Sequence, residues 1–318
     1  MRHVTSAVFV CFVALVTLVT GSLGGSLGGG RAFATPFEPG TVPDKVEVVG
    51  HLDVDALRKT QIFAAVGGQA VIDAALDEAP PELRPAARAL AQAVRGVSFW
   101  RDTEHGALYL ETKDGRSLAQ LIGKLPAKPQ RSIDGVATYT MGDGDKHGFG
   151  AVFGDTLVLA DSTESLERSI HVLGGKAGSL AGSNKLPSAS RQGVFVFVTI
   201  GDNMLGAIQK SAHSKVLQLA IRSLVVDVGE GAGLVTANAR AEMRSADALQ
   251  KARSILDGMR ALASLSDEPA ARTLLDGVTV TANGLALEVA AKLPVAELAK
   301  MIQEKHEKHD KHDKHDKE

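Results

Sequence analysis

The chain has 318 residues, with 35 Lys and Arg against 37 Asp and Glu, so its formal net charge is −2. This balance excludes a surface that attracts nucleic acid as a whole, and no nucleic-acid partner is predicted. Hydrophobic residues make up 44% of the chain, which excludes global disorder and is enough for a large core.

Residues 1–34 have the features of a secretory signal peptide. A short basic start at residues 1–3 precedes an almost wholly apolar run at residues 8–19, and Ala32-Phe33-Ala34 matches an A-x-A cleavage site. The apolar run is shorter than the ~18 residues that a membrane-spanning helix needs. We therefore expect an exported protein, periplasmic or extracellular, typical of a bacterial envelope. An uncleaved leader that anchors the chain in the membrane is the alternative.

The single cysteine, Cys11, lies inside this leader. Cleavage after Ala34 would leave a mature chain without thiols, so its stability would depend on a packed core and not on disulfides. The same absence argues against thiol catalysis, iron–sulfur clusters, covalent haem attachment and cysteine-based zinc sites.

Beyond a proline-containing leader at residues 35–43, one pattern recurs along the chain: strand, turn, strand, then helix. Each helix is indicated by apolar residues on one face, most clearly at i, i+3, i+4 and i+7 in the first and last instances. The four instances span residues 97–125, 136–173, 224–263 and 278–302. A further strand and helix precede the first and third instances.

These elements predict an α+β fold with antiparallel hairpins, built from two similar halves of order β-α-ββ-α-ββ-α. The predicted boundaries are 44–174 for the first half, 175–192 for a Gly/Ser-rich linker, 193–303 for the second half and 304–318 for a tail. We interpret the repetition as internal duplication. Coincidence is the alternative, since hairpin-then-helix is common, and the pattern leaves open whether the halves share one sheet.

Two predicted hairpin turns combine a histidine with nearby carboxylates, which is a pairing suited to general-base chemistry or metal binding. The weak catalytic candidates are His105, His147, Asp102 and Asp145. Polar residues are ordinary in turns, however. The corresponding turns of the second half, residues 229–233 and Asn283-Gly284, contain no histidine, so we favour solvated turns over a catalytic site.

No sequence motif for catalysis or cofactor binding is present. The chain has no G-x-S-x-G elbow, no H-E-x-x-H helix and no phosphate-binding G-x-x-x-x-G-K-[ST] loop. We therefore expect no required cofactor and a protein that is not an enzyme.

The C-terminal tail is the most specific feature of the sequence. Its histidines recur at every third position, as His306, His309, His312 and His315. Imidazoles bind zinc, nickel and copper well, and histidine-rich tracts are typical of metal binding. The alternative is a solvated low-complexity end that aids solubility.

Together these features predict an exported, non-enzymatic protein that binds an unknown envelope protein or a small ligand and carries a metal-binding tail. An exported hydrolase that uses the loop histidines and aspartates is the alternative function. Contact with a membrane is expected only if the leader stays attached.

Overall fold

The computed structural model describes residues 37–302 except 79–80, 82–83, 114, 116–117, 119–121, 123–126, 143–147, 183–193, 210–219, 266–271 and 273–275. The predicted signal peptide, most of the linker, the tail histidines, Asp145 and His147 lie outside the described residues. Within the described part of the chain, no helix combines the length and apolar character needed to span a membrane.

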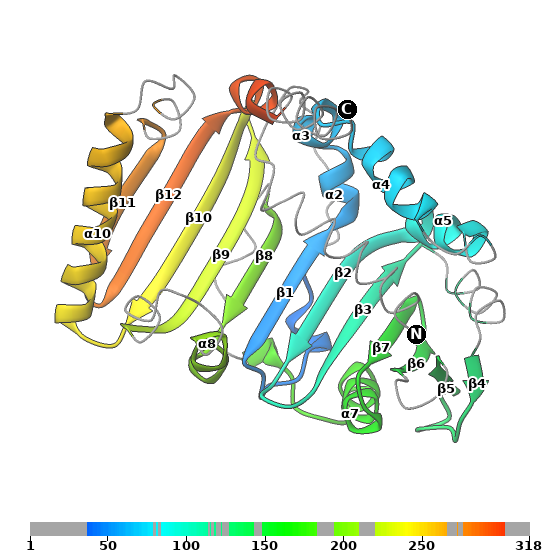
Figure 1. Ribbon diagram of the computed structural model, residues 1–318. Helices are drawn as coiled ribbons and strands as arrows, with labels where there is room; N and C mark the ends of the chain where they lie inside the picture. Colours follow the sequence, from blue (N-terminus) through cyan, green and yellow to red (C-terminus); the bar gives the residue numbers. More distant parts are fainter. Residues whose placement is uncertain are drawn as a thin grey trace, which may run out of the picture.

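In the described part of the chain, an antiparallel sheet of 12 strands forms the centre (Figure 1). The first half contributes β1 (Val48–Asp53), β2 (Val94–Arg101), β3 (Gly106–Thr112), β4 (Ala127–Pro129), β5 (Thr138–Met141), β6 (Gly148–Phe153) and β7 (Thr156–Ala160). The second contributes β8 (Val194–Ile200), β9 (Ile221–Gly231), β10 (Leu234–Met243), β11 (Val278–Asn283) and β12 (Ala286–Pro294). The predicted α+β class is confirmed, and both halves share this sheet.

The strand order is β11-β12-β10-β9-β8-β1-β2-β3-β7-β6-β5-β4, so β1 and β8 pair at the junction of the halves. Outward from β1 come β2, β3 and the β6–β7 hairpin. Outward from β8 come β9, β10 and the β11–β12 hairpin, and in each half the second strand of the hairpin joins the sheet. The halves therefore add strands in the same order, with β4 and β5 as an addition to the first. The internal duplication itself stays a prediction.

The helices are α2 (Val54–Arg58), α3 (Gln61–Ala65), α4 (Gly68–Asp77), α5 (Arg84–Ala93), α7 (Thr163–Leu173), α8 (Asp202–Gln209) and α10 (Ala246–Ser264), together with the short 3-10 turns η1 (Pro39–Thr41) and η2 (Leu180–Gly182). Residues 295–302 are also helical. The region from Asp55 to Leu76 is divided into α2, α3 and α4 because the Thr60 hydroxyl caps α3 and Gly67 has a φ of 62°.

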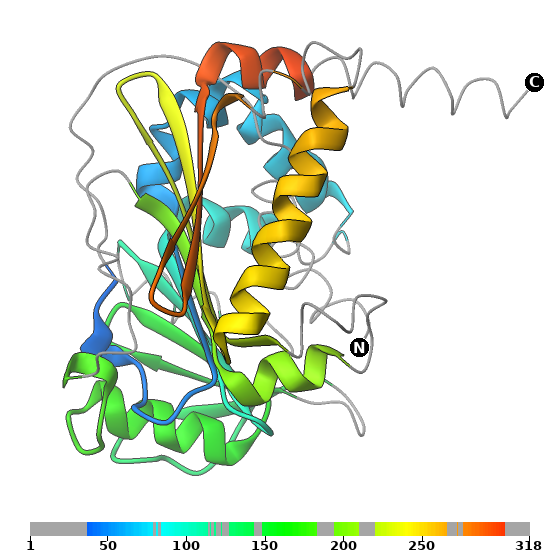
Figure 2. The same cartoon turned by 90° about the vertical axis from the view of Figure 1, so that its left-hand side faces the viewer.

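The helices divide between the two faces of the sheet. Figure 2 shows α2–α5 and α10 on one side, which we call the helical face, and α7 on the other. On the helical face, Leu52, Leu110 and Leu157 pack with Leu57 of α2 and Ile62 of α3. Each strand therefore buries alternate residues on opposite sides.

The α7 face has its own core around two aromatic residues. Trp100 and Tyr109 are both 1% exposed, and the Trp100 Nε1–H donates to the Tyr109 hydroxyl over 2.8 Å. Leu166 and Ile170 of α7 pack in the same cluster. Burial is the main cause that raises the pKa of Tyr109 to about 12.

The proline-containing leader and the start of the linker also belong to this core. Val42 is fully buried, Leu180 is 1% exposed, and the Leu180 N–H donates to the Val42 carbonyl over 2.9 Å. Phe37 makes an edge-to-face contact with Phe197, with ring centroids 4.9 Å apart. These segments therefore cover the α7 face of the sheet where β1 and β8 pair.

We predict that Gly50→Ala destabilises the protein by about 1–3 kcal/mol, the usual cost of overpacking a core. Gly50 lies in the central strand β1, and an added Cβ would collide with the Phe99 ring and lie 3.2 Å from the Phe197 carbonyl oxygen. Urea unfolding measures the change. Gly231→Ala is the matched control, since nothing lies within 4 Å of a Cβ there. Equal losses in both variants would refute this account.

Candidate functional site

The predicted candidates Asp102 and His105 lie in the turn between β2 and β3. Asp102 Oδ1 accepts the backbone N–H groups of Glu104 over 2.9 Å and of His105 over 2.7 Å, which closes the turn. Its Oδ2 accepts a hydrogen bond from Arg168 Nη1 over 2.9 Å. Although burial opposes ionisation, these backbone donors and the Arg168 guanidinium together lower the pKa of Asp102.

Arg168 extends from α7 and joins three segments of the chain. Besides Asp102, its Nη2 donates to the Lys45 carbonyl over 2.7 Å, and its guanidinium carbon lies 4.9 Å from the centre of the Trp100 ring. The side chain is 28% exposed, so these contacts are partly shielded from water. Arg168 therefore holds the turn and the segment before β1 against α7.

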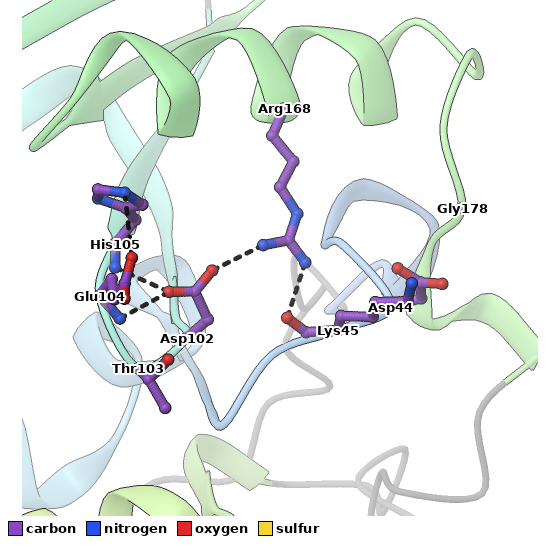
Figure 3. Close-up of a pocket in the computed structure, with 8 residues that line it drawn as sticks. All are labelled: Asp44, Lys45, Asp102, Thr103, Glu104, His105, Arg168 and Gly178. Carbon is purple, nitrogen blue, oxygen red and sulfur yellow. Dashed lines mark hydrogen bonds and ion pairs between the residues drawn. The ribbon is translucent and has the colours of Figure 1, made fainter.

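A cavity of about 560 Å³ opens beside this arginine (Figure 3). Its walls are mainly polar and are formed by Asp44, Lys45, Asp102, Thr103, Glu104, His105, Arg168 and Gly178. Two of the charged residues in these walls, Asp102 and Arg168, form an ion pair with each other. Among the described residues, no group of three or more His, Cys, Asp or Glu side chains could hold a metal ion.

The His105 ring has carboxylates nearby but none within hydrogen-bonding distance. Its Nδ1 lies 4.0 Å from Asp161 Oδ1, and its Nε2 lies 4.0 Å from Glu104 Oε2. The Asp161 Oδ1 atom instead accepts the Ser165 hydroxyl over 2.8 Å, at the start of α7. The structure thus brings His105 and Asp102 into one turn but uses Asp102 for capping and ion pairing.

The described ends of β5 and β6 that flank the second predicted turn lie at the same end of the sheet as the β2–β3 turn. Ala160 at the end of β7 pairs with Ala107 of β3 on one side and Phe149 of β6 on the other. The start of β6 therefore lies beside the end of β7, two strands away from the start of β3. His147 and Asp145, which belong to that turn, lie outside the described residues.

A buried polar network that the sequence did not reveal connects three adjacent strands. His51 Nδ1 lies 2.9 Å from the Ser98 hydroxyl, which donates to Glu111 Oε1 over 3.1 Å. His51 is 5% exposed and Ser98 is 1% exposed. Gly96 leaves room for the network, because a Cβ there would lie 3.1 Å from Glu111 Oε2 and 3.4 Å from His51 Cε1.

Burial is the main reason why the pKa of Glu111 is raised, with the nearby carboxylates of Glu38 and Asp53 adding to the effect against the Ser98 hydrogen bond and Arg95. Since His51 and Ser98 have almost no contact with solvent, we assign the network a structural role. Only the strand register, which places His51 opposite Ser98, could have revealed it.

A different kind of surface lies on the helical face of the second half. Val198, Val226, Ala239 and Val289 stand directly opposite one another on β8, β9, β10 and β12, and we call these four residues the apolar row. Each of the four is partly exposed. Val228, Val235 and Leu293 on one side belong to the large core, while Ala241 and Leu287 on the other pack with α10. The apolar row lies between these two clusters.

The described side chains of α10 that pack against the sheet lie between Ala248 and Leu256. Ala248, Leu249, Ala252 and Leu256 pack with Met243 and Leu287. Figure 2 shows the helix close to the sheet at its start and diverging from it toward its C-terminal end. The apolar row is therefore flanked by helices and still partly open to solvent.

No protein-family profile and no curated protein matches the sequence. Solved structures do resemble the fold. Crystal form III of a protein named TP0453 is 9% identical, with a TM-score of 0.51, over 84% of this chain and 98% of that one. Crystal form IV of TP0453 is 11% identical, with a TM-score of 0.51, over 84% and 96%. At these identities the likeness shows a shared fold.

We predict that Arg168→Ala lowers the free energy of unfolding by about 2–3 kcal/mol, because it removes two charge-assisted hydrogen bonds and the contact with Trp100. Urea unfolding monitored by Trp100 fluorescence measures the loss. Arg131→Ala is the control, since its pair with Glu167 is 3.7 Å long and its side chain is 72% exposed, so it should change stability by less than ~1 kcal/mol. A loss at Arg168 no larger than at Arg131 would contradict this role.

Proposed function

We propose that the protein is an exported, non-enzymatic binding protein that holds an aliphatic ligand, such as an acyl chain, on the apolar row. The observation that carries the proposal is the partial exposure of Val198, Val226, Ala239 and Val289 in the middle of the sheet. Apolar surface left in contact with water costs about 25 cal/mol per Å², so a ligand that covers the row gains this energy.

The chemistry of the row favours an aliphatic ligand over an aromatic or polar one. Its side chains are those of three valines and one alanine, with no hydroxyl, amide or charge among them. Sugars and nucleobases usually need aromatic platforms or hydrogen-bonding groups. An alkyl chain needs only close apolar contact, which flat rows of Val and Ala provide.

Phe99 extends the apolar surface from the row toward the first half. Val198 pairs with Gly50 of β1, and the Phe99 ring lies over the position where a side chain of Gly50 would be. Phe99 is itself partly exposed. The surface offered to a ligand therefore crosses the junction of the halves on a continuous sheet.

We predict that Ala239→Phe abolishes or strongly weakens binding of a dansyl-labelled fatty acid, because the added ring occupies the row. Fluorescence titration should show at least a tenfold rise in Kd. Ala290→Phe is the matched control. Ala290 stands opposite Asn238, so it lies on the other face of the neighbouring strand and is also partly exposed.

Binding by the parent protein and by Ala290→Phe, with loss in Ala239→Phe, supports the assignment. The absence of binding by the parent protein, or equal effects of the two substitutions, would refute it. Circular dichroism and urea unfolding of both variants separate a blocked row from a misfolded chain.

We further propose that the histidines of the tail, which lies outside the described residues, bind a divalent metal such as Zn²⁺. Calorimetric titration with Zn²⁺ should give heat for the full chain and none for a chain ending at Glu304. A full-length chain with His306, His309, His312 and His315 replaced by Gln is the matched control and should behave like the truncated one. Binding should weaken as the pH falls below ~6.5, since only neutral imidazole binds metal. Equal heats from the full and truncated chains would refute the proposal.

An exported hydrolase remains the second candidate function. Its support is that the start of β6 and the β2–β3 turn lie at the same end of the sheet. Because Asp102 is committed to Arg168 and to its own turn, such an enzyme would depend on His105 together with Asp145 or His147.

A further inference from the structure

The two edges of the sheet differ in how well they are protected against pairing with another strand. The edge strand β4 has three residues and includes Lys128 and Pro129, both of which discourage strand addition. The opposite edge strand, β11, has six residues and contains neither a charge nor a proline. Its pairing with β12 runs without a bulge. Long, regular, uncharged edges of this kind are templates for a further strand.

The hairpin register shows which backbone groups of β11 face outward. Asn283 and Ala286 flank the two-residue turn at Gly284-Leu285, so they form a hydrogen-bonded pair. Because such pairs alternate with open ones along an antiparallel ladder, Thr279 and Thr281 also bond to β12. The N–H and C=O groups of Val278, Val280 and Ala282 therefore point away from the sheet.

The strand is complementary to a second copy of itself. Around a two-fold axis at Val280, Val280 opposes its own copy, Val278 opposes Ala282 and Thr279 opposes Thr281. Opposed residues in antiparallel strands lie on the same face of the sheet. Apolar side chains would thus meet on the helical face, and threonines would meet on the other.

Helix α10 lies beside β11 on the helical face, where Val280 packs with the α10 cluster (Figure 1). The large hydrophobic residues of the described chain that are exposed are Ile255, Leu265 and Leu285, and all three lie on α10, at its end or in the β11–β12 turn. Three of the ion pairs near β11 are closed within the chain: Arg240–Glu288, Lys251–Asp247 and Arg253–Asp257.

We propose that two copies of this chain associate through antiparallel pairing of their β11 strands, which joins their sheets into one. The outward groups of Val278, Val280 and Ala282 form the new ladder. Isologous pairing about a two-fold axis is the commonest way in which identical chains assemble. The inference is independent of the ligand proposed for the apolar row.

Sedimentation equilibrium of the full chain tests the proposal. We expect a dimer, and we expect Ala282→Pro to raise its dissociation constant at least tenfold, because proline removes an outward N–H and blocks the approach of a second strand. Ala282→Val, which keeps the N–H, is the matched control and should remain dimeric. Thr279→Lys combined with Thr281→Lys is a second test that leaves the backbone intact and places lysines opposite each other across the axis.

Cross-linking tests the register. In a Cys11→Ser background, Val280→Cys should form a disulfide-linked dimer on mild oxidation, since opposed Cα atoms in a hydrogen-bonded pair lie about 5.5 Å apart. Asn283→Cys should not, because it lies away from the axis. A monomeric parent protein at ~100 μM, a dimer that survives both the proline and the lysine substitutions, or cross-linking at residue 283 but not 280 would each overturn the proposal.

Discussion

The pairing of β1 with β8 is the constraint on which the rest of the structure depends. Residues 37–302 contain no cysteine, so no disulfide connects the halves there. They are joined instead by a five-pair ladder from Val48 opposite Ile200 to Leu52 opposite Val196, with Val49 and Phe197 buried on one side and Leu52 on the other. Main-chain hydrogen bonds and the burial of apolar side chains hold the two halves together at this junction. Because this burial occurs on both sides of β1, both faces of the sheet near β1 must be covered.

Coverage of the sheet decreases away from that junction, and this decrease creates the candidate binding surface. The first half has α7 on one face and α2–α5 on the other, whereas in the second half Thr236, Asn238 and Arg240 form a polar face opposite Ala237, Ala239 and Ala241. Between the large core and the α10 cluster, the middle of the apolar face is partly open. This partly open strip is the apolar row.

The period of the apolar residues was enough to predict most strands and helices, because alternation and helical spacing are local properties of the chain. The hairpin β9–β10 and the helix α10 follow directly from them. Sheet order and register depend on contacts between residues far apart in sequence. The period of the apolar residues therefore could not predict the pairing of His51 with Ser98 or the ion pair of Arg168 with Asp102. Asp102 and His105 were correctly predicted to lie in a turn, and the polarity of Asp102 reflects its capping of that turn.

The exposed edge and the apolar row are related through a single residue. Val280 of β11 stands opposite Val289, the outermost member of the row, and on the proposed two-fold axis it also meets its own copy. Pairing through β11 would therefore carry the row of one chain into that of the other across the helical face. Because the row depends on side chains and the pairing on backbone groups, Ala239→Phe should leave the dimer intact while Ala282→Pro separates the two rows without filling either. Ligand binding and assembly can thus be tested separately on one continuous surface.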